Sequence, residues 1–331
     1  MRNLRPKELK SLHANILSWY RKHSRALSWR DTTDPYEILV SEVMLQQTQV
    51  SRVQEKLPAF LKTFPTFSAL SRATTSDVVR AWHGMGYNSR AVRLRDLARK
   101  VETDFDGSLP ETVDELQSLP GIGPYTAHAV SCFAMKKRVP LVDVNIRRVF
   151  SRMFWKMQST SDLRSEKEIW AISKDVLAKN AYLWNQALMD LGATICTARN
   201  PVCAYCPVAG HCASRKLGSA DAATQRAVTR RTTASRVKPG NTTTSSARAS
   251  ATEPMYDGIP QRIWRGKIVQ RLRSLNGKQT VSIQRLGKSI RQQFRRSELP
   301  WLVSVVDRLR SDGLVAVRQT PRSLFVSLRH E

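Results

Sequence analysis

The chain has 331 residues, with 54 Lys and Arg against 27 Asp and Glu, and its formal net charge is +27. This charge favours a polyanionic partner, while a hydrophobic content of 41% excludes a wholly disordered basic protein. No apolar run approaches the roughly 18 residues that cross a bilayer, and the first residues lack the apolar stretch of a secretory signal. We therefore expect a soluble, intracellular protein that binds a polyanion and does not bind membranes.

Residues 1–216 carry a net charge of +12 and a helical pattern almost throughout. Apolar residues at a spacing of three and four predict helices through Leu9–Tyr20 and Tyr36–Met44. Pro and Gly residues separate further predicted helices, which cover 54–64, 76–82, 89–104, 111–118, 125–135, 145–153, 165–178 and 183–191. The fold class of this part is therefore mainly α.

The remaining residues divide into two parts with different compositions. Residues 217–254 carry +4 and are rich in Ser, Thr and Ala, which predicts a disordered linker. Residues 255–331 carry a net charge of +11. Their pattern predicts helices over 260–274, 283–290 and 298–311, followed by short strands over 314–318 and 323–327. Three helices followed by a hairpin are the order of a winged-helix domain.

Glu42 lies in an apolar stretch of the second predicted helix, where Ile38 and Leu45 come close to its face. Burial there would raise the pKa of its carboxyl and keep it protonated, as a general acid requires. The alternative is a solvated glutamate on an exposed face.

A possible phosphate-binding turn lies at Leu119–Ala127, where Gly121 and Gly123 permit a tight turn and Pro124 suits a first helical turn. Exposed amides at such a helix start can hold a DNA phosphate without reading sequence. An ordinary turn between helices remains the alternative.

Asp143 stands after an extended segment and before the predicted helix that contains Asn145. As an N-cap it should remain ionised, because the helix dipole and the free amides favour an anion. One neutral and one charged carboxylate are the pair that cleaves a glycosidic bond. Alternatively, Asp143 only caps its helix.

Four cysteines form a compact loop with the spacing Cys-x6-Cys-x2-Cys-x5-Cys, and they are Cys196, Cys203, Cys206 and Cys212. Four converging thiolates suit a [4Fe-4S] cluster, and tetrahedral zinc is the alternative. Cys132 lies alone in an apolar stretch and is interpreted as a buried core thiol.

Five motifs occur together in this chain: Ser41–Val50, Gly84–Tyr87, the turn at Leu119–Ala127, Asp143 with Asn145, and the cysteine loop. In this order and spacing, over about residues 5–215, they resemble the mismatch-specific adenine DNA glycosylases (MutY type) of the helix-hairpin-helix superfamily. The resemblance implies a six-helix barrel domain over 31–143 with the hairpin, and a cluster domain formed by 1–30 and 144–216.

The resemblance also implies a reaction and a partner. The partner is double-stranded DNA that contains a mismatch or an oxidised guanine, and the cofactor is a [4Fe-4S] cluster. Glu42 would protonate a flipped adenine at N7, and Asp143, beside Asn145, would stabilise the sugar cation. Tyr125 replaces the lysine of bifunctional relatives, which predicts a monofunctional enzyme.

The DNA-contacting residues implied by the same resemblance belong to three loops, and they are Gln46, Gln47, Thr48, Tyr87, Gly121 and Gly123. Gln47 and Tyr87 would enter the duplex near the orphan base. Their alternative role is packing in the core.

The sequence departs from the family at several positions. Val144 follows Asp143 where many members have Gly, and His83 and Asn88 flank the Tyr87 loop. Residues 255–331 do not resemble the Nudix-like domain with which long members recognise 8-oxoguanine. Recognition of 8-oxoguanine is therefore a separate question from excision of adenine.

The C-terminal part carries many basic residues on and near its predicted helices, namely Arg262, Arg265, Lys267, Arg271, Arg273, Arg291, Arg295 and Arg296. Such residues could neutralise phosphates and add an auxiliary DNA contact. A protein-docking role and a merely solvated face are the alternatives.

Two other functions remain open at this point. One is a thymine or uracil mismatch glycosylase of the same superfamily. The other is an iron–sulfur winged-helix regulator that binds DNA without catalysis, although such a regulator has no need of Glu42 or Asp143.

Overall fold

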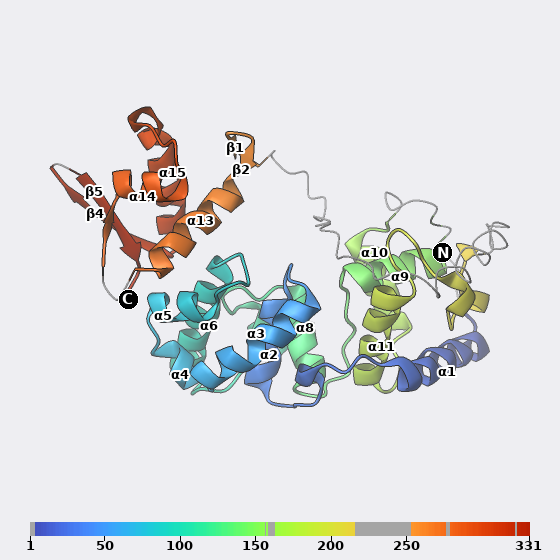
Figure 1. Cartoon of the computed structure of the whole chain (residues 1–331). Coiled ribbons are helices and arrows are strands. Elements are labelled where there is room, and N and C mark those ends of the chain that lie inside the picture. Colours follow the sequence, from blue (N-terminus) through green and yellow to red (C-terminus); the bar gives the residue numbers. More distant parts are fainter. Residues whose placement is uncertain (1–3, 156, 158–162, 216–252, 276–278, 322) are drawn as a thin grey trace. The chain divides into compact units, whose positions relative to one another are not determined.

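The computed structural model describes residues 4–155, 157, 163–215, 253–275, 279–321 and 323–331 (Figure 1). The predicted linker 217–254 lies outside the described residues except at 253 and 254. The described residues form two units. Unit 1 takes its residues from Met1–Pro35, Glu111–Val113 and Gly123–Thr243, and unit 2 from Tyr36–Pro110, Asp114–Ile122 and Thr244–Glu331.

Unit 1 is helical in its described residues, with the elements α1 (Pro6–His23), η1 (Ser28–Arg30), α8 (Pro124–Phe133), α9 (Val144–Phe154), α10 (Glu166–Asp175), α11 (Ala181–Thr194), η3 (Cys203–Tyr205) and η4 (Ala209–His211). Helix α11 packs against α1, α8 and α9. The predicted periodicity of α1 is confirmed, because Leu12, Ile16 and Tyr20 are its buried residues. This arrangement places the end of α11 next to α9.

Unit 2 contains α2 (Pro35–Leu45), α3 (Val50–Thr63), α4 (Phe67–Ser71), α5 (Thr75–Ala81) and α6 (Ser89–Asp104), while α7 (Val113–Gln117) lies at the boundary with unit 1. Helix α6 packs against α4 and α5. Helix α2 is buried on most of its circumference, and its buried residues run from Tyr36 and Ile38 through Met44. A helix buried in this way belongs to the interior of a domain.

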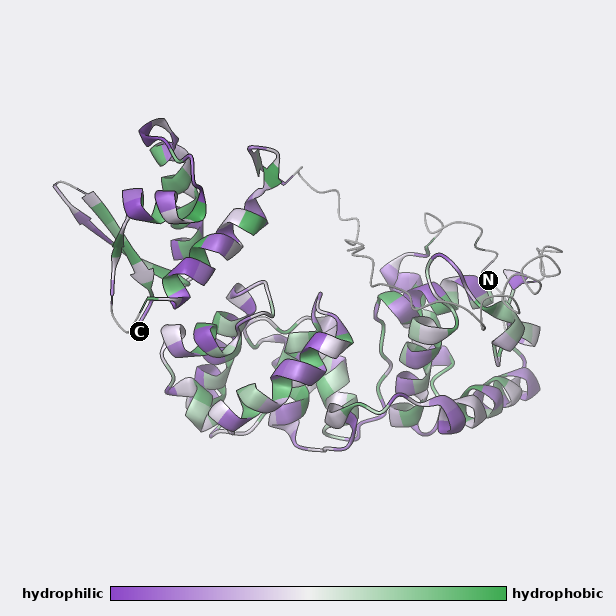
Figure 2. Cartoon of the chain, viewed as in Figure 1, coloured by the Kyte–Doolittle hydropathy of each residue, from purple (hydrophilic) through white to green (hydrophobic). Residues whose placement is uncertain are grey.

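The C-terminal residues of unit 2 form β1 (Met255–Tyr256), β2 (Ile259–Pro260), α13 (Gln261–Arg273), β3 (Val281–Ser282), α14 (Ile283–Ile290), α15 (Leu299–Ser311), β4 (Val315–Thr320) and β5 (Ser323–Leu328). The strands β3, β5 and β4 make an antiparallel sheet in that order, with Val281 and Val317 both opposite Val326. Figure 2 shows hydrophobic and hydrophilic residues side by side along α13 and α15. Their apolar sides form the core that the helices share with the sheet.

The predicted helices and the C-terminal hairpin are present, and the differences lie at their ends. The short α4 and the two-residue strands have too few residues for a periodic pattern, and they were not predicted. Helix α10 ends at Asp175 instead of residue 178. In the part of the chain that the structure describes, no helix has the length and apolarity needed to cross a membrane.

Candidate active site

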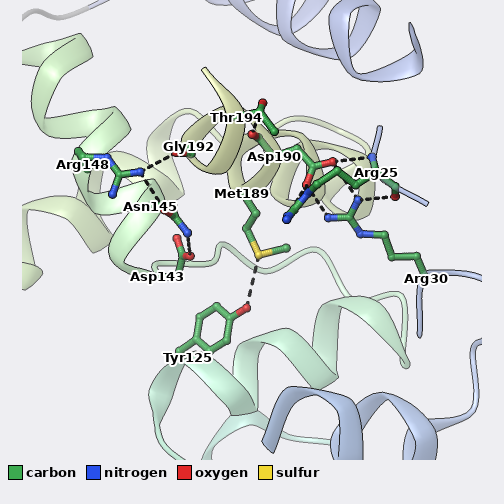
Figure 3. Close-up of polar contacts among 10 residues, drawn as sticks. All are labelled: Arg25, Arg30, Tyr125, Asp143, Asn145, Arg148, Met189, Asp190, Gly192 and Thr194. Carbon is green, nitrogen blue, oxygen red and sulfur yellow. Dashed lines mark hydrogen bonds and ion pairs between the residues drawn. The ribbon is translucent and has the colours of Figure 1, made fainter. Parts of the chain in front are cut away.

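Asp143 caps the N-terminus of α9, as predicted. Its Oδ2 accepts a hydrogen bond from Asn145 Nδ2 at 2.9 Å (Figure 3). Its Oδ1 accepts one from the Ile146 amide at 2.6 Å. The Asp143 backbone is extended, so the carboxylate turns back onto the first turn of the helix. Both oxygens of this carboxylate are therefore fixed.

Opposing effects act on the pKa of Asp143. Burial raises the pKa of Asp143 above its ordinary value, although the hydrogen bonds from Ile146 and Asn145 and the charge of Arg148 lower it. The predicted stabilisation of the anion is thus present, but desolvation outweighs it. That Asp143 stays ionised remains a prediction.

A chain of hydrogen bonds connects Asp143 to the cysteine loop. Asn145 Oδ1 accepts from Arg148 Nη2 at 2.8 Å, and Arg148 also donates to the Gly192 carbonyl at 2.6 Å (Figure 3). Arg148 Nε donates to the Cys196 carbonyl at 2.8 Å. The amide of Asn145 is therefore oriented, with its nitrogen toward Asp143 and its oxygen toward Arg148. The position of Asp143 depends on residues far away in the sequence.

Helix α11 supplies the other polar contacts in this part of unit 1. The Tyr125 hydroxyl, on α8, donates to Met189 Sδ at 3.4 Å. On the next residue, the buried Asp190 carboxylate accepts from Arg25 Nε at 2.7 Å and from Arg30 Nη2 at 2.8 Å (Figure 3). Two guanidinium groups on one buried carboxylate hold the segment before α2 against α11.

The four predicted cluster cysteines line one cavity of about 510 Å³ in unit 1, together with Arg152. Arg152 Nη1 donates to Cys196 Sγ at 3.3 Å and to the Thr197 carbonyl at 2.7 Å. Among the described residues, no group of three or more His, Cys, Asp or Glu side chains lies close enough together to hold a single metal ion. A cavity of this size lined by thiols fits a cubane cluster, whose ligands stand farther apart than those of one zinc ion.

Cys132 has the predicted core position, with no exposed surface. Asn185 Nδ2 donates to its Sγ at 3.3 Å, and burial raises the pKa of the Cys132 thiol to about 11. It lies on α8, outside the cysteine loop, and remains a protonated core thiol.

Glu42 is buried on α2, with 5% of its surface exposed. This burial excludes the alternative of a solvated glutamate. Its neighbours Leu39 and Val43 on the same helix are buried as well.

Arg90 organises two loops of unit 2, although it was not singled out from the sequence. It is 7% exposed and donates to the Gln46 carbonyl at 2.6 Å, to Thr48 Oγ1 at 3.0 Å and to the Met85 carbonyl at 3.1 Å. Burial lowers the pKa of Arg90 to about 10, so it keeps its charge at neutral pH. One guanidinium group therefore ties the loop after α2 to the loop before α6.

Each of these loops presents a non-glycine residue with a left-handed backbone, Gln47 with φ 54° and Tyr87 with φ 43°. Both side chains are exposed, Tyr87 to 52%. The alternative of core packing is thus excluded for both. The Arg90 guanidinium lies 5.7 Å from the centre of the Tyr87 ring, a cation–π contact.

The turn before α8 has one glycine that its backbone needs. Gly121 has φ 81°, and an added Cβ would lie 3.3 Å from the Arg93 side chain. Gly123 has an extended backbone with open space around it, so the expectation that both glycines shape the turn holds for Gly121 only. Pro124 occupies the first turn of α8, as predicted.

Several basic residues of the C-terminal part are engaged within the protein. Ion pairs join Arg262 to Glu253, Arg265 to Asp312 and Arg291 to Glu298. Arg273 donates to oxygens of the α5–α6 region. Arg295 and Arg296 are exposed, and they are the better candidates for phosphate contact.

The structure thus groups Asp143, Asn145, Tyr125 and the four cysteines in unit 1, and Glu42, Gln46–Thr48 and Tyr87 in unit 2. The residues missed from the sequence are Arg90, Arg148 and Gly192. Only Arg148 had a signal in the sequence, because it follows Asn145 by three residues and so lies on the same face of the helix.

Two family models match the chain. Residues 40–175 match the helix-hairpin-helix (HhH-GPD) superfamily of base excision DNA repair proteins, and residues 196–212 match the iron–sulfur binding domain of endonuclease III. The second match covers all four cysteines of the cavity. This match supports a [4Fe-4S] cluster as the cofactor, and the assignment of the four cysteines as its ligands stays a prediction.

Curated relatives extend the similarity to more than half of the chain. An adenine DNA glycosylase of Mycobacterium tuberculosis is 43% identical over 210 residues, which are 62% of this chain and 67% of that protein. The Mycolicibacterium smegmatis adenine DNA glycosylase is 44% identical over 208 residues, which are 61% of this chain and 69% of that protein. The human adenine DNA glycosylase is 36% identical over 219 residues, covering 63% of this chain and 40% of the relative.

Solved structures share the fold. A thermostable thymine-DNA glycosylase superposes with a TM-score of 0.60 at 30% identity, covering 64% of this chain and 98% of the other. A trapped endonuclease III–DNA complex superposes with a TM-score of 0.56 at 20% identity, covering 65% of this chain and 99% of the other. The latter similarity shows the fold alone.

Proposed function

Because the chain belongs to the adenine DNA glycosylase family of the helix-hairpin-helix superfamily, we propose that it is a monofunctional base excision repair enzyme that hydrolyses adenine mispaired with 8-oxoguanine or guanine. The observation that carries the proposal is the setting of Asp143, whose oxygens are held by the Ile146 amide and by Asn145. A carboxylate fixed in this way can stabilise a sugar cation without rearranging during the reaction.

The reaction divides the work between two carboxyl groups. The buried Glu42 protonates N7 of the flipped adenine and makes the base a neutral leaving group. Asp143 then stabilises the oxocarbenium-like sugar, directly or as a transient adduct, until water completes the hydrolysis. Asn145 holds Asp143 in place during these steps.

Tyr125 makes the enzyme monofunctional. A phenol cannot form the Schiff base through which an amine breaks the DNA strand. The product is therefore an abasic site in an intact strand, which breaks only when alkali is added.

Double-stranded DNA with a mismatch or an oxidised guanine is the proposed partner of a monomeric, cytoplasmic enzyme. Gln46, Gln47, Thr48 and Tyr87 contact the bases around the lesion, and exposure of Gln47 and Tyr87 supports that role. The turn of Gly121 and Gly123 presents backbone amides to a phosphate.

For the C-terminal part we propose a winged-helix module. Its helices α13, α14 and α15, with the sheet order β3-β5-β4 and the β4–β5 hairpin as a wing, have the topology of that motif. Its exposed Arg295 and Arg296 add a contact to the DNA backbone.

A thymine or uracil mismatch glycosylase is the second candidate, because the solved thymine-DNA glycosylase is 30% identical to this chain. The adenine glycosylases are more similar, at 43% and 44%. A DNA-binding regulator is less well supported, since it has no use for the fixed Asp143 carboxylate.

A panel of duplexes separates these functions. The purified protein is incubated with A opposite 8-oxoguanine, A opposite guanine, and T or U opposite guanine, followed by alkali. We expect alkali-dependent breaks at adenine, and none with the Asp143→Asn variant. Breaks confined to the T and U strands would support the second candidate, and binding without any breaks would support the regulator.

A further inference from the structure

The C-terminal part packs directly on two helices of the same unit. Val79 of α5 and Val92 of α6 belong to the buried hydrophobic cluster that includes Ile268 of α13 and Leu309 of α15. The α13–α15 part is thus joined to α5 and α6 by a shared apolar core, in addition to the connecting chain.

Polar contacts surround this apolar core. Two arginines cap each other's helices: Arg80 donates to the carbonyl of Arg273 and, at 2.7 Å, to that of Leu275, at the C-terminal end of α13. In return, Arg273 Nε donates to the Val79 carbonyl near the end of α5 at 3.0 Å. The last carbonyls of a helix lack partners within the helix and attract cations, so each guanidinium satisfies the other helix.

A second set of contacts holds the far end of the chain. The main-chain oxygen of Glu331 accepts from Thr75 Oγ1 at 2.8 Å and from Arg95 at 2.6 Å. Thr75 and Arg95 are both buried. The C-terminal part is therefore attached to α5 and α6 at two separate places.

Arg273 also reaches the loop that presents Tyr87. Its Nη2 donates to Asn88 Oδ1 at 2.6 Å, and Asn88 immediately follows Tyr87. In this loop Gly84, Gly86 and Tyr87 all have positive φ. A left-handed backbone at a tyrosine is unfavourable by itself, so the surrounding contacts must maintain it.

The loop is consequently held from two sides. Arg90 binds it from within the helical body through the Met85 and Gly86 carbonyls, at 3.1 and 3.3 Å. Arg273 binds it through Asn88 from the C-terminal part. This use of Arg273 replaces the phosphate contact expected from its sequence position.

We propose that Arg273 is a positioning residue for the Tyr87 loop, so that the C-terminal part sets the geometry with which this loop meets DNA. The effect on DNA rests on the proposed function, whereas the restraint of the loop does not. The C-terminal part then influences recognition of the mismatch without touching it.

Hydrogen exchange in the full-length protein tests the restraint alone. The probes are the amides of Met85, Arg90 and Ala91, which donate to carbonyls within the loop segment. We expect Arg273→Ala to accelerate their exchange roughly tenfold, the effect of one lost hydrogen bond to a charged group. The control is Arg285→Ala, which removes the same charge from an exposed position on α14.

Asn88→Ala provides a second test if Arg273→Ala weakens the fold, because it removes the acceptor and leaves Arg273 in place. It should accelerate exchange at the same amides. The proposal is overturned if both variants leave these amides unchanged, or if exchange rises only over residues 261–275 of α13.

The DNA part of the proposal is tested in the Asp143→Asn background, which prevents turnover. We compare dissociation constants for a duplex with A opposite 8-oxoguanine and for a fully paired duplex. Arg273→Ala should reduce the ratio of the two affinities about tenfold, while Arg285→Ala should leave the ratio unchanged. Faster exchange with an unaltered ratio would contradict the link to DNA, and failure of the proposed function would appear instead as equal binding of both duplexes by the parent protein.

Discussion

Asp143 shows how opposing effects act on one residue. Its place at the start of a helix was evident from the sequence, and so were the amide and dipole effects that favour its anion. The extent of its desolvation was not evident, because desolvation depends on segments distant in the chain. Burial raises the pKa of Asp143, and the hydrogen bonds from Ile146 and Asn145 act against that rise.

Removing the Asn145 side chain should therefore move the pH dependence of catalysis. Without its hydrogen bond the pKa of Asp143 rises further, so less of the required carboxylate is present and the acid limb of the pH–rate profile moves to higher pH. For Asn145→Ala we expect a single-turnover rate at neutral pH about tenfold lower, from the loss of one charge-assisted hydrogen bond.

The matched control is Arg147→Ala, since Arg147 lies on the same turn and donates to the Arg164 carbonyl. Its profile should keep the acid limb of the unmodified protein. An Asn145→Ala profile that superimposes on the control would show that Asn145 does not tune Asp143.

At the scale of helices, the close approach of α9 and α11 aligns the site. A Cβ on Gly192 of α11 would lie 2.6 Å from Asn145 Cβ, closer than two non-bonded carbon atoms approach each other. The same glycine offers its carbonyl to Arg148. Gly192 therefore affects both the packing of α9 against α11 and the orientation of Asn145.

Gly192→Ala should displace Asn145 and strain the contact between the helices. We expect a loss of about 1–3 kcal/mol in the free energy of unfolding, measured by urea denaturation, together with slower adenine excision. Gly210→Ala is a suitable control, because nothing lies within 4 Å of a Cβ added there. Equal stability of the two variants would be inconsistent with the crowding.

Much of the helical framework could be predicted, because α1, α2, α6 and α9 have long periodic patterns or clear caps. Contacts between distant segments could not. Arg90 carries a charge and would ordinarily be placed on the surface, yet it is buried against carbonyls of two loops. The partners of Arg148 and Arg273 likewise depend on tertiary packing, which no local pattern reports.

For the whole molecule, the charge of +27 overstates the charge available to DNA. Ion pairs neutralise Arg262, Arg265 and Arg291, and Arg80 and Arg273 are committed to the contact between α5 and α13. The exposed remainder can still attract a polyanion over a distance.

A variant of the exposed Arg296 tests whether the remaining basic residues contact DNA. If Arg296 contacts a phosphate, Arg296→Ala should weaken binding of paired and mismatched duplexes alike, and should reduce the slope of log K against log salt by about one. Fluorescence anisotropy titrations between low and moderate salt measure this slope. A slope equal to that of the unmodified protein would remove Arg296 from the interface.

The most direct test of the central claim is detection of the released base. The protein in excess is mixed with a duplex that carries a single A opposite 8-oxoguanine, and free adenine is quantified by mass spectrometry over one turnover. We predict free adenine at the stoichiometry of the duplex, an intact strand until alkali is added, and no adenine from the Asp143→Asn variant. Adenine release by that variant at the unmodified rate, or no release by the unmodified protein, would contradict the account.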